Sequence, residues 1–191
     1  MKNQQLTVLL LGGARRVSLA ELLIRSGKRI GYKVNIVSYD LSEEVPISIV
    51  GKVIKGLRWN DPGVVDDIER VVKEYEVNII LPFVNGAIEI ASICKDKMPD
   101  VFVPVTDFDT ASKLFDKVEA AKVFKEAGLP IPRTYSVLSA QMPALAKPRK
   151  GGSSRGIHIF NNMEEFMHLQ NLQNYLCLLY TSPSPRDLST S

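Results

Sequence analysis

A lysine followed by a loop of small residues is the feature of this sequence best suited to chemistry. Lys147 closes an apolar stretch, and Arg155 lies within the loop that comes after it. The loop consists of Gly151, Gly152, Ser153, Ser154, Arg155 and Gly156. Because glycine allows close backbone approach and positive φ angles, such a loop can fold its amides over an anion. With an ammonium and a guanidinium beside it, the pattern predicts a site for the phosphates of a nucleotide.

The segments on either side of this loop predict the two strands of a hairpin. Residues 142–146 and 157–160 are short apolar runs that favour strands. Walker loops and dinucleotide fingerprints instead place their glycines before a helix, where free amides and the helix dipole meet the phosphate. In this chain the amides must therefore come from a turn that folds over the ligand. Arg155 either binds phosphate there or orders the hairpin.

A second group of candidate residues lies near the start of the chain. Gly12 and Gly13 follow an apolar run, and Arg15 and Arg16 come soon after them. Doubly wound sheets receive ligands at the carboxyl ends of their strands, so these residues hold an anionic substrate, line the cleft that faces the nucleotide, or form an ordinary turn with solvated arginines. Asp40 is placed like the acid that binds ribose in dinucleotide enzymes, but the turn lacks the third small residue of that fingerprint.

The elements that must position these residues alternate between strands and helices. Strands are predicted over 6–11, 33–38, 51–55, 78–82 and 101–104, with helices over 17–30, 61–75 and 86–95 between them. Asp61 and Pro62 are typical of a helix start. Further helices are expected after Asp107, after Asp116 and over 163–167. Residues 1–110 are therefore predicted to form an α/β domain with a doubly wound parallel sheet.

Composition narrows the classes of function. With 191 residues, 45% of them apolar, the chain can form one domain and part of another. A net charge of +3, with basic and acidic residues interspersed, argues against nucleic-acid binding. Cys94 and Cys177 fit no metal or redox spacing, so we expect a buried or half-buried thiol at Cys94 and assign no metal ligand. The first apolar run is too short for a signal peptide or a membrane span, which favours the cytoplasm.

The last residues differ in character from the rest. Ser, Thr and Pro supply 8 of the 15 residues from 177 to 191, which predicts a disordered tail. The segment 177–187 also resembles the conceptual translation of a transposase-type sequencing adaptor. We therefore expect residues 177–191 to be non-native and the protein before them to be a fragment that was cut near Leu176.

The doubly wound domain is followed by the helix at Asp116 and Lys117, then by Lys147 and the glycine loop. This order closely resembles that of the ATP-grasp superfamily over residues 6–176. Within it, the chain is similar to the group of the large chain of carbamoyl phosphate synthetase, which includes the pyrrolysine-synthesising ligase. The resemblance implies a pre-ATP-grasp, Rossmann-like domain over 1–110 and the start of an α+β ATP-grasp domain over 111–176. It also implies that Lys117 and Lys147 contact the phosphates of ATP. The role of Lys117 depends on the resemblance alone, and its other reading is a solvated charge near a helix start.

The implied activity is that of an ATP-dependent ligase. Such an enzyme activates a small carboxylate as an acyl phosphate, which an amine or another nucleophile then attacks, and it requires Mg²⁺. The magnesium ligands and acceptor residues of the superfamily match positions downstream of Leu176, so we assign no catalytic residue and expect the chain itself to be inactive. Two alternatives stay open: a Rossmann-type module for a dinucleotide or nucleotide sugar, such as a reductase, and a non-catalytic nucleotide-binding homologue.

Overall fold

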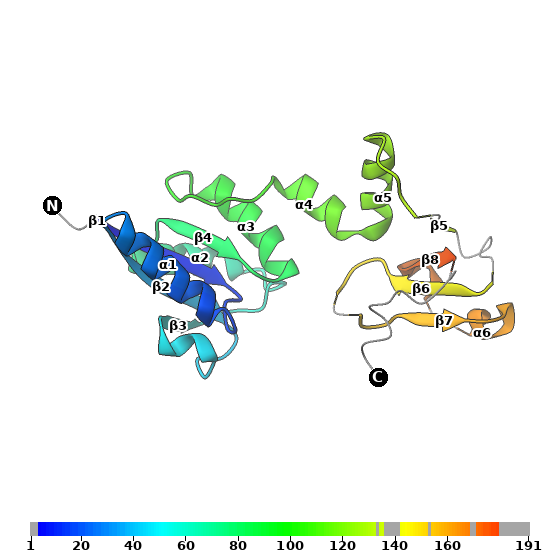
Figure 1. Ribbon diagram of the computed structural model, residues 1–191, viewed down its shortest axis with the longest axis horizontal. Helices are drawn as coiled ribbons and strands as arrows, with labels where there is room; N and C mark the ends of the chain where they lie inside the picture. The colour runs from blue at the N-terminus through cyan, green and yellow to red at the C-terminus, as the bar shows by residue number, and fades with distance from the viewer. Residues whose placement is uncertain (1–3, 133, 136–141, 153, 169–170, 180–191) are drawn as a thin grey trace. The chain divides into compact units, whose positions relative to one another are not determined.

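The computed structural model describes residues 4–132, 134–135, 142–152, 154–168 and 171–179 (Figure 1). The chain divides into two units, residues 1–111 and 112–191, and each is described by itself. Two sequence predictions lie outside the described residues: Ser153 of the predicted phosphate loop, and residues 180–191 of the predicted tail.

The first unit is built on a parallel sheet with helices on both faces (Figure 1). Its elements are β1 (Gln4–Leu11), α1 (Val17–Arg29), β2 (Tyr32–Asp40), η1 (Pro46–Ile49), β3 (Lys52–Lys55), α2 (Val64–Glu74), β4 (Ile79–Pro82) and α3 (Asn85–Lys97). The strand order is β3-β2-β1-β4, and all neighbours are parallel. The predicted doubly wound α/β fold is confirmed.

Strand β1 explains why the sheet has a core on each face. Val8 and Leu10 pack on one side in a cluster that includes Ala20 of α1. Leu9 and Leu11 pack on the other side in a cluster with buried residues of α2 and α3. A strand segment that is buried on both faces favours apolar residues at successive positions, which is why Val8 to Leu11 form an unbroken apolar run.

Two predicted boundaries in this unit are wrong. Residues 101–104 form a single parallel bridge instead of a fifth strand, in which Phe102 exchanges hydrogen bonds with Asn78 O (2.8 Å) and Ile80 N (3.0 Å). Pro104 has no N–H to continue the pairing. Helix α2 begins at Val64 rather than at Asp61, because Asp61 Oδ1 accepts a hydrogen bond from Gly63 N (2.9 Å) and closes a turn ahead of the helix.

The second unit contains an antiparallel sheet. Its elements are α5 (Lys117–Glu126), β5 (Thr134–Tyr135), β6 (Ala144–Pro148), β7 (His158–Phe160), α6 (Met163–Met167), η3 (Leu172–Asn174) and β8 (Tyr175–Leu179), and α4 (Phe108–Phe115) crosses the boundary between the units. The strand order is β5-β8-β6-β7. The predicted hairpin is confirmed, since β6 and β7 pair antiparallel from Ala144 with Phe160 to Ala146 with His158.

The predicted start of the disordered tail is wrong for its first three residues. Cys177 to Leu179 complete strand β8, which pairs with β6 and with β5. Cys177 is 1% exposed and packs in one cluster with Ala146, Phe160 and Phe166. The apolar run at this point fits a strand, and the Ser- and Pro-rich composition of the following residues obscured it.

The two cysteines are buried, as predicted for Cys94. Burial raises the pKa of the Cys94 thiol to about 12 and also raises that of Cys177, so neither is a reactive thiolate near neutral pH. Among the helices of the described part of the chain, none is long and apolar enough to cross a membrane.

Candidate functional site

The position of Lys147 follows from the alternation of side chains along β6. Ala146, the residue before it, is fully buried in the core of the second unit. Successive side chains of a strand point to opposite faces, so Lys147 lies on the face away from that core. Its backbone pairs with Leu176 of β8. The sheet therefore fixes the backbone of Lys147 while its side chain stays partly exposed.

The predicted glycine loop joins β6 to β7 and depends on glycine at two described positions. Gly151 has φ +113° and Gly156 has φ +71°, both in the left-handed region. An L side chain adopts φ +113° only at a cost, so Gly151 is required by the backbone. Ser154 also has a positive φ of 56°. The described loop residues from Lys150 to Gly156 are exposed, and the amide of Arg155 donates to Gly152 O (3.4 Å) within the loop.

Helix α5 brings Lys117 to this loop. Asp116 is the N-cap of α5, and its Oδ1 accepts hydrogen bonds from Val118 N (2.9 Å) and Glu119 N (3.5 Å). A carboxylate satisfies free amides at a helix start and also interacts favourably with the helix dipole. Since α5 begins at Lys117, the cap fixes the backbone position from which the Lys117 side chain extends.

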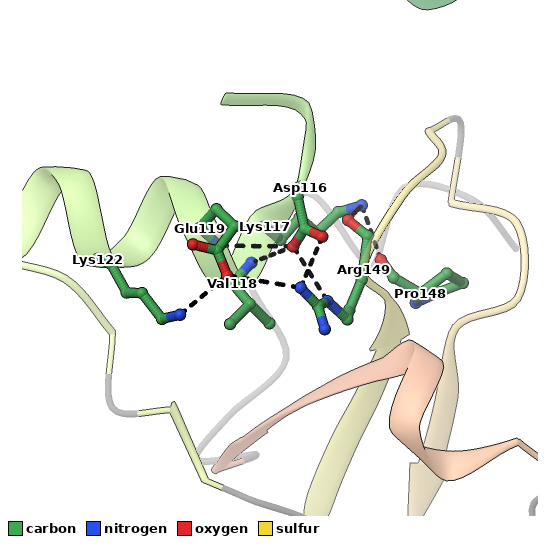
Figure 2. A network of polar contacts seen from close by, with 7 residues as sticks. All are labelled: Asp116, Lys117, Val118, Glu119, Lys122, Pro148 and Arg149. Atoms are coloured by element: carbon green, nitrogen blue, oxygen red, sulfur yellow. Dashed lines mark hydrogen bonds and ion pairs between the residues drawn. The ribbon is translucent and has the colours of Figure 1, made fainter. Parts of the chain in front are cut away.

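The ammonium of Lys117 is held by the backbone of the loop, as Figure 2 shows for Pro148. Its Nζ donates to Pro148 O (2.8 Å), Arg149 O (3.3 Å) and Gly151 O (3.0 Å). The backbone N of Lys117 also donates to Arg149 O (3.0 Å). The start of α5 and the start of the loop are thus joined by side-chain and main-chain hydrogen bonds.

The two lysines predicted from the sequence lie close enough to interact. Burial lowers the pKa of Lys117, and the positive charge of Lys147 lowers it further, against the opposing effect of Asp116. Two ammonium groups that repel each other in this way mark a place where an anion would be favourable.

An ion pair that sequence reasoning missed lies beside these lysines. Arg149 Nε donates to Asp116 Oδ1 (3.1 Å), and Arg149 Nη2 donates to Asp116 Oδ2 (2.8 Å), as seen in Figure 2. Burial raises the pKa of Asp116, but Arg149 and the amides of Val118 and Glu119 outweigh it and hold the pKa below its usual value. The available signals were an aspartate directly before Lys117 and an arginine two residues after Lys147.

The described residues contain no cluster of side chains typical of a metal site. Within them, no group of three or more His, Cys, Asp or Glu lies together. The carboxylates nearest the loop are engaged, since Asp116 binds Arg149 and Glu119 Oε1 accepts from Lys122 Nζ (2.9 Å). We therefore assign none of the described residues as a ligand of the magnesium that the sequence resemblance implies.

The second group of candidates surrounds a hollow of about 470 Å³ in the first unit. It lies where β1, β2 and β4 end, and Gly12, Arg15 and Arg16 line it together with Asp40. Arg15 and Arg16 are exposed. Two basic side chains around an open hollow suit an anionic group.

The turn before α1 is closely packed at Gly13 and is held by Asp40 of β2. A side chain at Gly13 would place Cβ 2.6 Å from Ser38 Oγ, so only glycine fits there. Asp40 accepts from Ala14 N (3.2 Å) and from Ser38 Oγ (2.5 Å), one bond on each carboxylate oxygen. Asp40 therefore braces this turn, which argues against the ribose-binding role considered from the sequence.

We expect the junction between α5 and the loop to weaken in acid. The pKa of Asp116 is lowered in the folded chain, so its stabilisation is present above the ordinary value of ~4 and is lost as the pH falls through the lowered value. Urea denaturation of the chain and of Asp116→Asn between pH 6 and pH 2 should show the two free energies of unfolding converging as the pH falls. A constant difference over this range would contradict the expectation.

Comparison with known proteins shows the fold. A scan against protein-family models found no match, and neither did a search of curated proteins. Among solved structures, an N5-carboxyaminoimidazole synthetase from Staphylococcus aureus complexed with ADP is similar, with 17% identity and a TM-score of 0.71. The match covers 95% of this chain and 49% of that one.

Two further structures have the same fold. The biotin carboxylase domain of Hydrogenobacter thermophilus 2-oxoglutarate carboxylase, in complex with MgADP, ADP and bicarbonate, matches with 19% identity and a TM-score of 0.69, over 92% of this chain and 44% of that one. L-amino acid ligase from Bacillus licheniformis matches with 13% identity and a TM-score of 0.67, over 94% and 45%. The chain thus spans about half the length of the structures it matches.

Proposed function

We propose that this chain is part of an ATP-dependent carboxylate-amine ligase of the ATP-grasp type. The observation that carries the proposal is the contact of the Lys117 ammonium with the carbonyls of Pro148, Arg149 and Gly151, which connect Lys147 to the rest of the glycine loop. Two of the structures with this fold were solved with ADP, and a third is an amino acid ligase. The carbamoyl phosphate synthetase-like group is proposed from the sequence resemblance alone.

In the proposed reaction the second unit binds and orients the triphosphate. The ammonium of Lys147 offsets the negative charge of the phosphate oxygens, and the amides of Gly151 and Gly152 donate to them from an exposed turn. Because β6 holds Lys147 in place before the ligand arrives, little reorganisation is needed when charge develops during phosphoryl transfer. The γ-phosphoryl group passes to a carboxylate oxygen with ADP as the leaving group, and a nucleophile then attacks the carbonyl carbon of the acyl phosphate and displaces inorganic phosphate.

We propose the hollow of the first unit as the place for an anionic part of the substrate. Arg15 and Arg16 supply positive charge there, Gly12 lines the hollow beside them, and Gly13 allows the tight turn that carries them. The complete reaction is proposed for a protein of the length of the structural neighbours, which would also supply the ligands of Mg²⁺. We therefore expect no substrate-dependent ATP turnover from this chain, and turnover above that of Lys147→Ala would contradict this.

Thermal melts of the chain with Mg-ATP and with NAD test the proposal. A ligand that binds only the folded state stabilises it by roughly 2.7 kcal/mol at 100 times its Kd. We expect the melting temperature to rise with the concentration of Mg-ATP and of tripolyphosphate, and to stay constant with NAD. A rise with NAD alone would favour the alternative of a dinucleotide-binding reductase.

A further inference from the structure

The ion pair between Asp116 and Arg149 joins the two segments that carry the predicted phosphate-binding lysines. Asp116 directly precedes Lys117, and Arg149 follows Lys147 by two residues. The pair is bidentate, with bonds of 3.1 and 2.8 Å, and the Asp116 side chain is only 12% exposed. A guanidinium held at two points fixes both distance and direction, which a single contact does not.

The ammonium of Lys117 has no free donor in this arrangement. A lysine carries three N–H donors, and Nζ of Lys117 has three carbonyl acceptors, on Pro148, Arg149 and Gly151. Lys117 can therefore contact a phosphate only if one or more of these carbonyls releases it. When that happens, the start of the loop loses part of what holds it against α5.

The Asp116–Arg149 pair does not depend on the bonds of the Lys117 ammonium. It uses neither the Lys117 ammonium nor its carbonyl partners, and the main-chain bond from Lys117 N to Arg149 O lies beside it. The charges in the junction also favour separation, because Lys117, Lys147 and Arg149 are all cationic. The Asp116 carboxylate is closer to Arg149 (2.8 Å) than the Glu119 carboxylate is (3.7 Å). The Glu119 side chain is also 38% exposed, so Asp116 offsets the positive charges more strongly.

We propose that Asp116 and Arg149 are positioning residues, which hold the start of α5 against the phosphate loop while Lys117 exchanges backbone carbonyls for a phosphate oxygen. This inference rests on the proposed function for its ligand. In this arrangement Nε and Nη2 of the Arg149 guanidinium are directed to Asp116, which assigns these two atoms to the junction.

Asp116→Asn distinguishes a positioning role from a simple electrostatic effect, because the two predict opposite changes in the affinity for Mg-ATP. Asparagine is as good an N-cap as aspartate, so α5 keeps its start while Arg149 loses its charged partner. If only charge mattered, removing a carboxylate near the site would strengthen the binding of an anion. Positioning predicts the reverse, a loss of about 10-fold in affinity for Mg-ATP, measured by competition with a fluorescent ATP analogue.

Asp107→Asn is the matched control. Asp107 accepts from Thr110 N (2.8 Å) near the start of α4 and has no cation partner among its described contacts. The same chemical change there should leave the affinity for Mg-ATP within about twofold of the original chain. Unchanged or tighter binding by Asp116→Asn, or an equal loss in both variants, would overturn the positioning role.

Amide exchange in the free chain tests the junction without nucleotide. The amides of Lys117 and Arg149 bond to Arg149 O (3.0 Å) and Asn174 O (2.8 Å). In Asp116→Asn we expect both to exchange about 10-fold faster, with no change in Asp107→Asn. Unchanged exchange in Asp116→Asn would refute the positioning role. If exchange is faster in this variant but the original chain does not bind Mg-ATP, the structural role of the ion pair stands and the proposed function is refuted.

Discussion

Replacing Lys147 with methionine should weaken the binding of Mg-ATP by about 10- to 100-fold, because a hydrogen bond to a charged group contributes roughly 1.5–3 kcal/mol. Methionine keeps most of the length of the side chain and removes only the ammonium. The change should spare the fold, since Lys147 lies on the face of β6 opposite the buried Ala146 and its ladder bonds are main-chain bonds. Titration with Mg-ATP at fixed ionic strength measures the effect.

Lys125→Met is the matched control for this loss. Lys125 lies in α5, in the same unit, and is exposed, so the variant loses the same charge at a distance from the glycine loop. General attraction between a basic surface and an anion is screened by salt, and we expect a change of about twofold or less. Equal weakening in both variants would point to general attraction, and an unchanged affinity of Lys147→Met would refute the proposed phosphate site.

The parts of the fold that were predictable are those with a local cause. The apolar run of β1 and the glycines that end it are visible in the sequence, and so is the hairpin around the glycine loop, because neighbouring strands pair across a short turn. Strand β8 was missed because its partners, β5 and β6, precede it in the sequence by about 30 to 40 residues. A strand was predicted over 101–104, where the structure has a single bridge at Phe102. An apolar run does not show how many backbone hydrogen bonds the neighbouring strand can form with it.

The candidate site was predictable as residue types but not as contacts. Lys147 and the glycine loop are recognisable because they are close in sequence. The partners of Asp116 and Lys117 are not, because Arg149 lies 33 positions from Asp116 and reaches it only when the start of α5 meets the residue that follows β6. An N-cap aspartate and a helix-start lysine are common, and the sequence does not show that their charges meet a loop. Contacts of this kind are set by tertiary structure, which local patterns do not encode.

The largest loss of stability is expected from Leu9→Ala, at about 2–5 kcal/mol of the free energy of unfolding. Leu9 is fully buried at the centre of the sheet, where β1 pairs with Val37 of β2 and Ile80 of β4. The truncation removes apolar contacts and leaves a cavity, because a strand with ladder bonds on both sides cannot move to fill it. Urea denaturation followed by the fluorescence of Trp59, the single tryptophan of the chain, reports on this unit.

Leu22→Ala makes the same truncation on α1, where the side chain is 46% exposed. Alanine is the strongest helix former, so part of the lost packing is offset and the cost should be below about 1 kcal/mol. The gap between the two variants measures how much of the first unit's stability comes from the two-sided core around β1. That core holds the turn at Gly12 and Gly13 at the carboxyl end of the sheet, so Leu9→Ala should also loosen the hollow beside Arg15 and Arg16. Equal costs for the two leucines would mean that β1 is not the centre of a two-sided core.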